Sequence, residues 1–150
     1  MILRIDRTWL LDLAHQFLPG DPDVTDYGTL AAAVARHADE VMDVPVYGAV
    51  HQRAAALMHQ LIRVPALESA NEHFAAVAAA SYLSASGVIV TAEPKHAVAL
   101  SARIRAGHAD VRETSTTIRM PGADGRLVHG HLEHLAGHPV RGAAVGDQLR

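Results

Sequence analysis

The residues best placed to do chemistry lie in one short stretch, residues 64–74, which reads Val-Pro-Ala-Leu-Glu-Ser-Ala-Asn-Glu-His-Phe. Pro65 ends a helical pattern, and an alanine-rich helical pattern follows the stretch. A loop that turns into a helix presents free backbone N–H groups at the positive end of the helix dipole, so it can hold an anion such as phosphate. Its polar groups are Glu68, Ser69, Asn71, Glu72 and His73.

The charges of this junction disfavour a bound phosphate. Glu68 and Glu72 flank the start of the predicted helix, where an ionised carboxylate is itself stabilised and would repel a phosphate. The remaining basic group is the imidazole of His73, and an imidazole is largely neutral at pH 7. The spacing from Ser69 to Glu72 fits a capping box, which predicts that Ser69 caps the helix and that Glu72 has a structural role.

Histidines elsewhere are weaker candidates. His59 lies six positions before Pro65 and could point toward the loop. His131 and His134 could share one helix face and bind Zn²⁺ weakly, but the glycines around them leave the ligands unorganised, so we expect no metal function. The full cluster near the C-terminus is His129, His131, His134 and His138.

The elements that must position these groups are helices. Apolar periodicity and capping residues predict helices over residues 6–18, 26–41, 50–63, 69–86, 94–106 and 110–119. We expect an all-α bundle around the fourth helix, because its many alanines let neighbouring helices approach closely. Residues 43–48 form an extended or turning link, since Pro45 argues against a helix there.

Two regions follow from the change in composition along the chain. Residues 1–120 form one helical domain, and residues 121–150 form a loosely ordered tail rich in Gly, Pro and His. A net charge of −3 and 4% aromatic residues argue against nucleic-acid binding. There are no cysteines, and no apolar run approaches the roughly 20 residues that span a bilayer. We therefore expect a soluble cytoplasmic protein with no membrane partner.

Several strings, in the same order and at similar spacing, resemble the Doc branch of the Fic/Doc family. They are Asp-Tyr-Gly-Thr-Leu at 26–30 with Ala-Val-Ala-Arg at 33–36, Arg-Ala-Ala-Ala-Leu at 53–57, Asn71, Tyr-Leu-Ser-Ala-Ser-Gly at 82–87, and residues 97–111. The resemblance covers residues 1–120. It implies a compact helical fold with a short extended flap, and the role of a toxin in a bacterial toxin–antitoxin pair. Members of the family transfer a nucleotidyl or phosphoryl group from a nucleotide to a protein hydroxyl.

The family motif reads His-x-Phe-x-Asp/Glu-Gly-Asn-Gly/Lys-Arg, and this chain retains its asparagine alone. With Asn71 on the motif asparagine, the other positions are occupied by Pro65, Leu67, Ser69, Ala70, Glu72 and His73. Pro65 replaces the histidine that activates the hydroxyl, and losing a general base typically costs about 10²- to 10⁴-fold. Ser69 replaces the acid that holds Mg²⁺, and a hydroxyl is a poor ligand for that ion.

The resulting hypothesis is a degenerate toxin component, not an enzyme and without a cofactor, that acts through protein contact. Its expected partners are a cognate antitoxin and a target protein related to translation, with residues 43–48 and 65–73 as the contact surface. An alternative is an active transferase that uses ATP and Mg²⁺, with Glu68 on the metal, Asn71 on phosphate, and His59 or His73 as the base. A second alternative is a helical scaffold protein unrelated to toxins.

Overall fold

Helices account for most of residues 2–119. The computed structural model describes residues 2–119. Within that range it contains α1 (Arg7–Phe17), α2 (Tyr27–His37), β1 (Glu40–Val41), β2 (Val44–Pro45), α3 (Val50–Arg63), α4 (Asn71–Ala85), α5 (Pro94–Arg105) and α6 (Val111–Arg119). The all-α expectation is confirmed.

Two helix boundaries differ from the prediction. The second helix ends at His37 rather than near residue 41, because the chain turns there into a hairpin, in which the Val46 amide donates to the Asp39 carbonyl at 2.9 Å. The fourth helix begins at Asn71, one residue later than a Ser69 cap would require. The bounds of the other helices agree with the sequence patterns to within about one residue.

Local capping explains where several helices begin. The carboxylate of Asp6 accepts from the Trp9 amide at 2.8 Å, and that of Asp26 accepts from the Gly28 amide at 2.8 Å. Asp110 and Glu113 cap α6 reciprocally, each side chain accepting from the other's backbone amide. These bonds satisfy N–H groups that the first helical turn leaves without partners.

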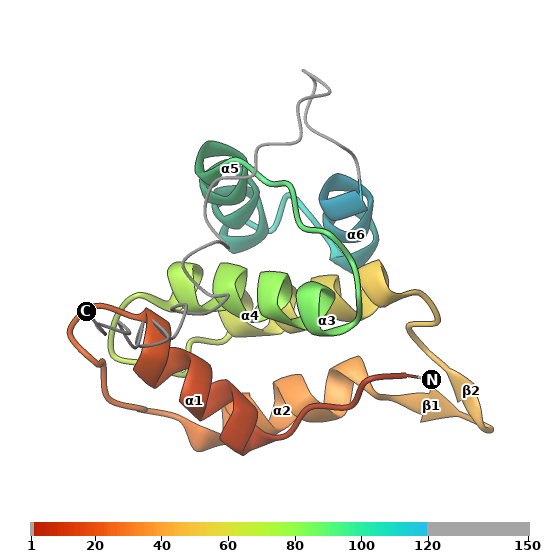
Figure 1. Cartoon of the computed structure of the whole chain (residues 1–150), viewed down its shortest axis with the longest axis horizontal. Coiled ribbons are helices and arrows are strands. Elements are labelled where there is room, and N and C mark those ends of the chain that lie inside the picture. Colours follow the sequence, from red (N-terminus) through yellow and green to blue (C-terminus); the bar gives the residue numbers. More distant parts are fainter. Residues whose placement is uncertain (1, 120–150) are drawn as a thin grey trace, which may run out of the picture.

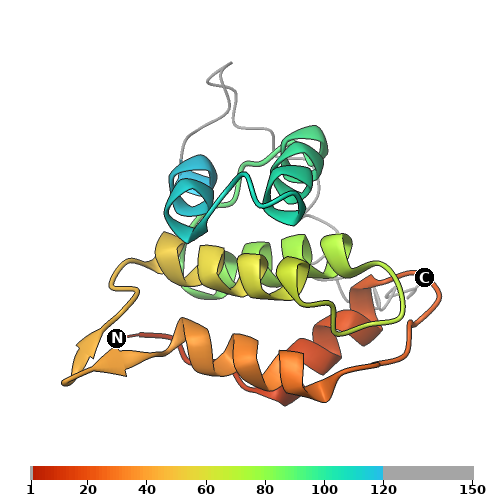
Figure 2. The same ribbon diagram turned by 180° about the vertical axis from the view of Figure 1, so that it is seen from behind.

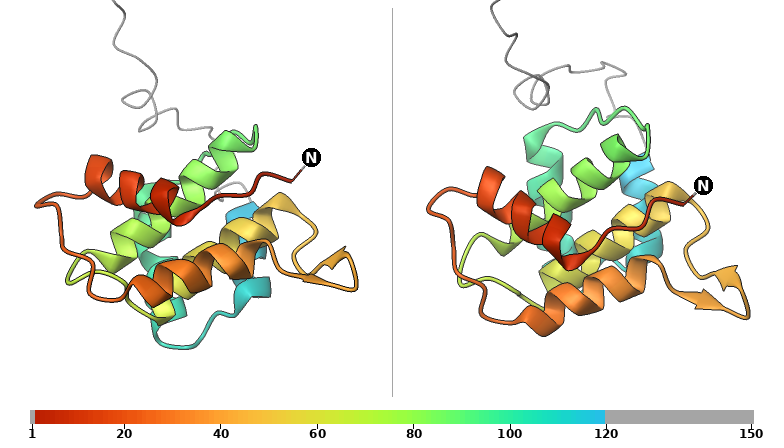
Figure 3. Two further views of the ribbon diagram at one scale, coloured as in Figure 1. Left: turned by 90° about the horizontal axis from the view of Figure 1, so that it is seen from below. Right: turned by 60° about the horizontal axis from the view of Figure 1, so that its bottom comes forward.

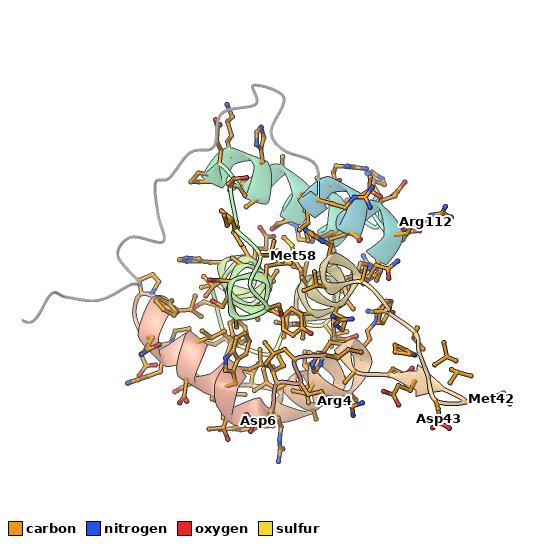
Figure 4. The ribbon with its side chains drawn as sticks, turned by 45° about the vertical axis from the view of Figure 1, so that its right-hand side comes forward. Arg4, Asp6, Met42, Asp43, Met58 and Arg112 are labelled. Carbon is orange, nitrogen blue, oxygen red and sulfur yellow. The ribbon has the colours of Figure 1, made fainter. Side chains whose placement is uncertain are left out.

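The helices stack in three layers (Figure 1; from behind in Figure 2). Antiparallel α3 and α4 form the middle layer, with α1 and α2 on one side and α5 and α6 on the other (Figure 4). Helix α3 contacts α2, α4, α5 and α6, and α4 contacts α1, α3 and α5. Both middle helices carry several buried alanines, and small side chains let neighbouring helices pack closely. The largest fully buried apolar side chains are Tyr82, Phe74, Leu10, Leu30, Leu57, Leu61 and Ile104.

The link between α2 and α3 is a β-hairpin that projects from the bundle (Figure 3). Val41 pairs with Val44, and the two turn residues, Met42 and Asp43, have φ values of 52° and 63°. A two-residue turn of this hand matches the twist of the strands but normally uses Asn or Gly. Pro45 is tolerated because β2 is an edge strand.

Some predictions concern residues beyond this range. The expected tail at residues 121–150, with its four histidines, lies outside the described residues. No helix among residues 2–119 combines the length and apolar character that crossing a bilayer requires.

Candidate functional site

The loop that joins α3 to α4, residues 64–70, contains most of the degenerate motif and is here called the motif loop. It is covered by residues 21–26, the end of the connection between α1 and α2. Val24 forms a β-bridge with Leu67, and the amides of Thr25 and Asp26 both donate to the Ala66 carbonyl, at 2.8 and 3.1 Å. The sequence carried no signal for this pairing, because residues 19–22 read only as a break between helices.

Asn71 fastens the motif loop from its other side. Its Oδ1 accepts from the amides of Ala66 and Leu67, at 3.1 and 2.9 Å, and its Nδ2 donates to the Leu67 carbonyl at 2.8 Å. Ala66 and Leu67 are both buried. The side chain that sequence reasoning assigned to phosphate therefore has three hydrogen bonds to the backbone of its own loop, and one amide hydrogen remains.

The predicted capping box is wrong. The residue before α4 is Ala70, which has a left-handed backbone with φ of 59°, and neither Ala70 nor Ser69 supplies a capping hydrogen bond. Asn71 holds the loop in a turn that places Ser69 outside the helix, where it is exposed. Ala70 occupies the glycine position of the family motif, and a positive φ is the conformation that favours glycine there.

Both carboxylates of the junction have partners. Glu68 accepts from the Asp23 amide at 3.1 Å, and its own amide donates to the Asp23 carbonyl at 3.0 Å. Glu72 pairs with Arg105 at the end of α5. Arg105 was missed by the sequence analysis, since nothing in the pattern indicates that the end of α5 lies beside the start of α4.

His59 lies half-buried on α3, and its neighbours belong to other elements. Its Nδ1 is 3.2 Å from an Nη of Arg36, and a guanidinium can only donate, so Nδ1 is the acceptor. The pKa of His59 is lowered by burial first, and then by the charges of Arg36 and Arg63. The charge of Asp110 and a hydrogen bond with the Ala109 backbone oppose this shift.

The hairpin and the motif loop do not form one surface, contrary to the prediction. The hairpin precedes the first residue of α3 and the motif loop follows its last residue. A helix of 14 residues is about 20 Å long, so the two lie at opposite ends of α3 (Figures 1 and 2). The neighbour of the motif loop is instead the segment of residues 21–26.

A second polar centre lies at the hairpin end of the middle layer. Arg53 is 7% exposed, and it donates to the Tyr82 hydroxyl at 2.9 Å and to the carbonyls of Tyr47 and Gly48 at 3.0 and 2.8 Å. His37 is 1% exposed and meets the Tyr82 ring edge to face. Arg53 lies close to Ala54 and Leu57 on the helix surface, so the sequence pattern could have indicated that it is buried.

The metal-binding potential of the described residues is limited. Among residues 2–119, no three His, Asp or Glu side chains gather where they could hold a metal ion. The alternative roles of Glu68 on a metal, Asn71 on phosphate and His59 or His73 as the base stay predictions. His73 is exposed at the start of α4.

Comparison with known proteins places the chain in a family. No family model matches it. It is 37% identical over 89 residues to the toxin Doc of Mycolicibacterium smegmatis (strain ATCC 700084 / mc(2)155), a match that covers 59% of this chain and 68% of that protein. This similarity, together with the helical architecture, shows that the chain belongs to the Doc toxin family.

Proposed function

We propose that this protein is the toxin component of a toxin–antitoxin pair, acts in the cytoplasm, and works through protein contact rather than group transfer. Its relative in M. smegmatis is named a Doc toxin, which supports the toxin role. The observation that carries the rest is the use of Asn71, the retained motif residue, to hold Ala66 and Leu67. Asn71 therefore stabilises the conformation of the loop, and this structural role does not require catalysis.

The other groups of the motif loop support the same proposal. Pro65 has no atom that accepts a proton, and it occupies the position of the general base. Mg²⁺ prefers carboxylates, but Glu68 is tied to Asp23 and Glu72 to Arg105. The Glu72–Arg105 pair is exposed and contributes less than about 1 kcal/mol, yet its carboxylate lies in the first turn of α4, where its negative charge would repel a phosphate at the helix N-terminus.

His59 is a poor replacement for the missing base. Its unprotonated nitrogen, Nδ1, accepts from Arg36, and Arg36 also donates to Gln60. Taking a proton at Nδ1 would break this contact and place two cations side by side. The rearranged transferase that uses His59 therefore requires the Arg36 side chain to leave Nδ1.

The outer face of the hairpin is the surface that we assign to protein contact. The apolar side chains there are Val41, Met42, Val44 and Val46, which are 61, 91, 64 and 45% exposed. Val41 and Val44 are cross-strand partners and share one face, and Met42 lies at the tip, far from the bundle (Figure 4). Asp43 is exposed beside Met42 at the tip, so the face fits an apolar segment with a basic neighbour, such as part of an antitoxin.

Growth of bacteria that express the protein tests the proposal. Expression should arrest growth, Val44→Lys should abolish the arrest or its relief by a co-expressed cognate antitoxin, and Glu68→Gln should change neither. Ile89→Lys is the matched control, because Ile89 is 77% exposed and lies outside the hairpin, in the link between α4 and α5. Arrest that Glu68→Gln abolishes and Val44→Lys spares would instead favour the transferase.

Calorimetry with ATP and Mg²⁺ provides a direct second measurement. The proposal predicts no detectable heat for the wild-type chain. Binding in the millimolar range or tighter that Glu68→Gln weakens would contradict it, because the carboxylate would then be a metal ligand.

A further inference from the structure

The first residues of the described chain, residues 2–5, form a short segment here called the N-terminal strap. Two of its backbone groups are fastened to different helices. The Tyr82 hydroxyl of α4 donates to the Leu3 carbonyl at 2.7 Å, and the Ile5 amide donates to Nε2 of His37, the last residue of α2, at 3.3 Å. Ile5 is part of the hydrophobic core.

These contacts define the protonation state of His37. Because Nε2 accepts from the Ile5 amide, the ring proton is on Nδ1, which donates to the Val34 carbonyl. The ring is 1% exposed and packs against Tyr82 with centroids 5.6 Å apart and planes 77° apart. The strap is therefore held by a neutral imidazole with both nitrogens engaged.

Charged groups on the surrounding elements oppose a second proton. Arg53 of α3 and Arg4 of the strap are the cations that act on His37. Arg4 is paired with Glu40 of β1, and Asp39 and Tyr47 lie with them around the same small pocket. The pKa of His37 is lowered, by burial first and then by the two arginines, against the opposing hydrogen bonds to the carbonyls of Val34 and Ala33.

We propose that His37 is an acid-sensitive latch that keeps the N-terminal strap closed and releases it on protonation. A proton on Nε2 would face the Ile5 amide, so two donors would meet where one hydrogen bond existed. The ring would also become a buried cation beside Arg53. Opening the strap relieves both effects, exposes Leu3 and Ile5, and separates Arg4 from Glu40 of β1.

The pH dependence of the opening follows from linkage. In the open state the imidazole is exposed and titrates near its ordinary value of about 6.5, whereas in the closed state it resists the proton. The open state therefore binds more protons below pH 6.5, and its population rises as the pH falls. The rise approaches tenfold per pH unit until the closed state is also protonated.

Amide hydrogen exchange of the whole chain tests the latch. The protection factor of the Ile5 amide, which corrects for the intrinsic effect of pH on exchange, should fall at least severalfold between pH 7.5 and pH 5.5. His37→Gln keeps an acceptor near the Nε2 position without titrating, so it should abolish that pH dependence. His15→Gln is the control, because His15 lies exposed on α1 and pairs with Asp21.

Three outcomes overturn the proposal. The first is an Ile5 protection factor that is the same at both pH values. The second is a pH dependence of this factor that persists in His37→Gln. The third is that His15→Gln removes the pH dependence as fully as His37→Gln does. Should His37→Gln fail to fold, the imidazole resonances of wild-type His37 decide. Protection should begin to fall near pH 6.5, while these resonances, which report mainly the closed state, titrate at a lower pH; a closed-state imidazole that titrates at pH 6.5 or above contradicts the latch.

Discussion

Asn71 and Leu67 exchange two hydrogen bonds, from the Leu67 amide to Oδ1 at 2.9 Å and from Nδ2 to the Leu67 carbonyl at 2.8 Å. Through these two bonds, the side-chain amide of Asn71 pairs with the backbone of Leu67 as a peptide group would. This explains how the motif asparagine can be kept while the residues around it change.

Asn71→Asp should destabilise the protein by about 1–3 kcal/mol. The carboxylate keeps an acceptor for the two amides, but it cannot donate to the Leu67 carbonyl and places a charge against it. Urea denaturation measures the change. Gln16→Glu, an equivalent amide-to-acid change at an exposed position of α1, should shift the free energy of unfolding by less than about 0.5 kcal/mol.

Ala70→Gly should stabilise the protein by about 0.5–1 kcal/mol. Ala70 has φ of 59°, a conformation that costs a residue with a Cβ about 1–2 kcal/mol, and the lower chain entropy of alanine offsets only part of that cost. The same substitution at Ala32, an exposed helical position of α2, should destabilise by about 0.5–1 kcal/mol. A loss of stability at both positions would show that the backbone at residue 70 is not left-handed.

Tyr82→Phe should destabilise the protein by about 1–3 kcal/mol. The hydroxyl accepts from Arg53 and donates to Leu3, so its removal leaves a buried guanidinium N–H and a backbone carbonyl without partners. Thermal unfolding compares it with Tyr27→Phe, which changes a tyrosine that is 57% exposed. Equal effects of the two substitutions would argue that the Arg53 network contributes nothing.

Stability should decline as the pH falls below about 6.5, and part of the decline should disappear in His59→Gln. The folded pKa of His59 is lowered by burial and by Arg36, so between that value and 6.5 the unfolded chain binds more protons. Denaturation midpoints at pH 7.5 and 5.5 measure the difference. His96→Gln, at an exposed position of α5, should retain the wild-type pH dependence.

The helices were predictable because their signals are local. Trp9, Leu10 and Leu13 make one apolar face, Asp26 caps α2, and Pro94 begins α5 as its fixed φ allows. The start of α4 was not predictable in the same way. A capping-box pattern at Ser69 was overridden by the Asn71 contacts to the motif loop, which are made only after the chain has turned.

The site depends on contacts that no local pattern encodes. The bridge from Val24 to Leu67 joins residues 43 positions apart, and Glu72 meets Arg105 across 33. The prediction that residues 43–48 lie beside the motif loop was wrong, because the whole length of α3 separates the two segments. The burial of Arg53 could be inferred from its helix face, but its hydrogen-bond partners could not.

A transfer assay is the most direct test of the central claim that the motif loop keeps its shape without transferring phosphorus. Purified wild-type protein is incubated with a bacterial lysate, Mg²⁺ and ATP labelled at either the α- or the γ-phosphate. We expect no protein band whose label depends on the added chain. A labelled acceptor that appears with wild type and is lost with Glu68→Gln would contradict the account.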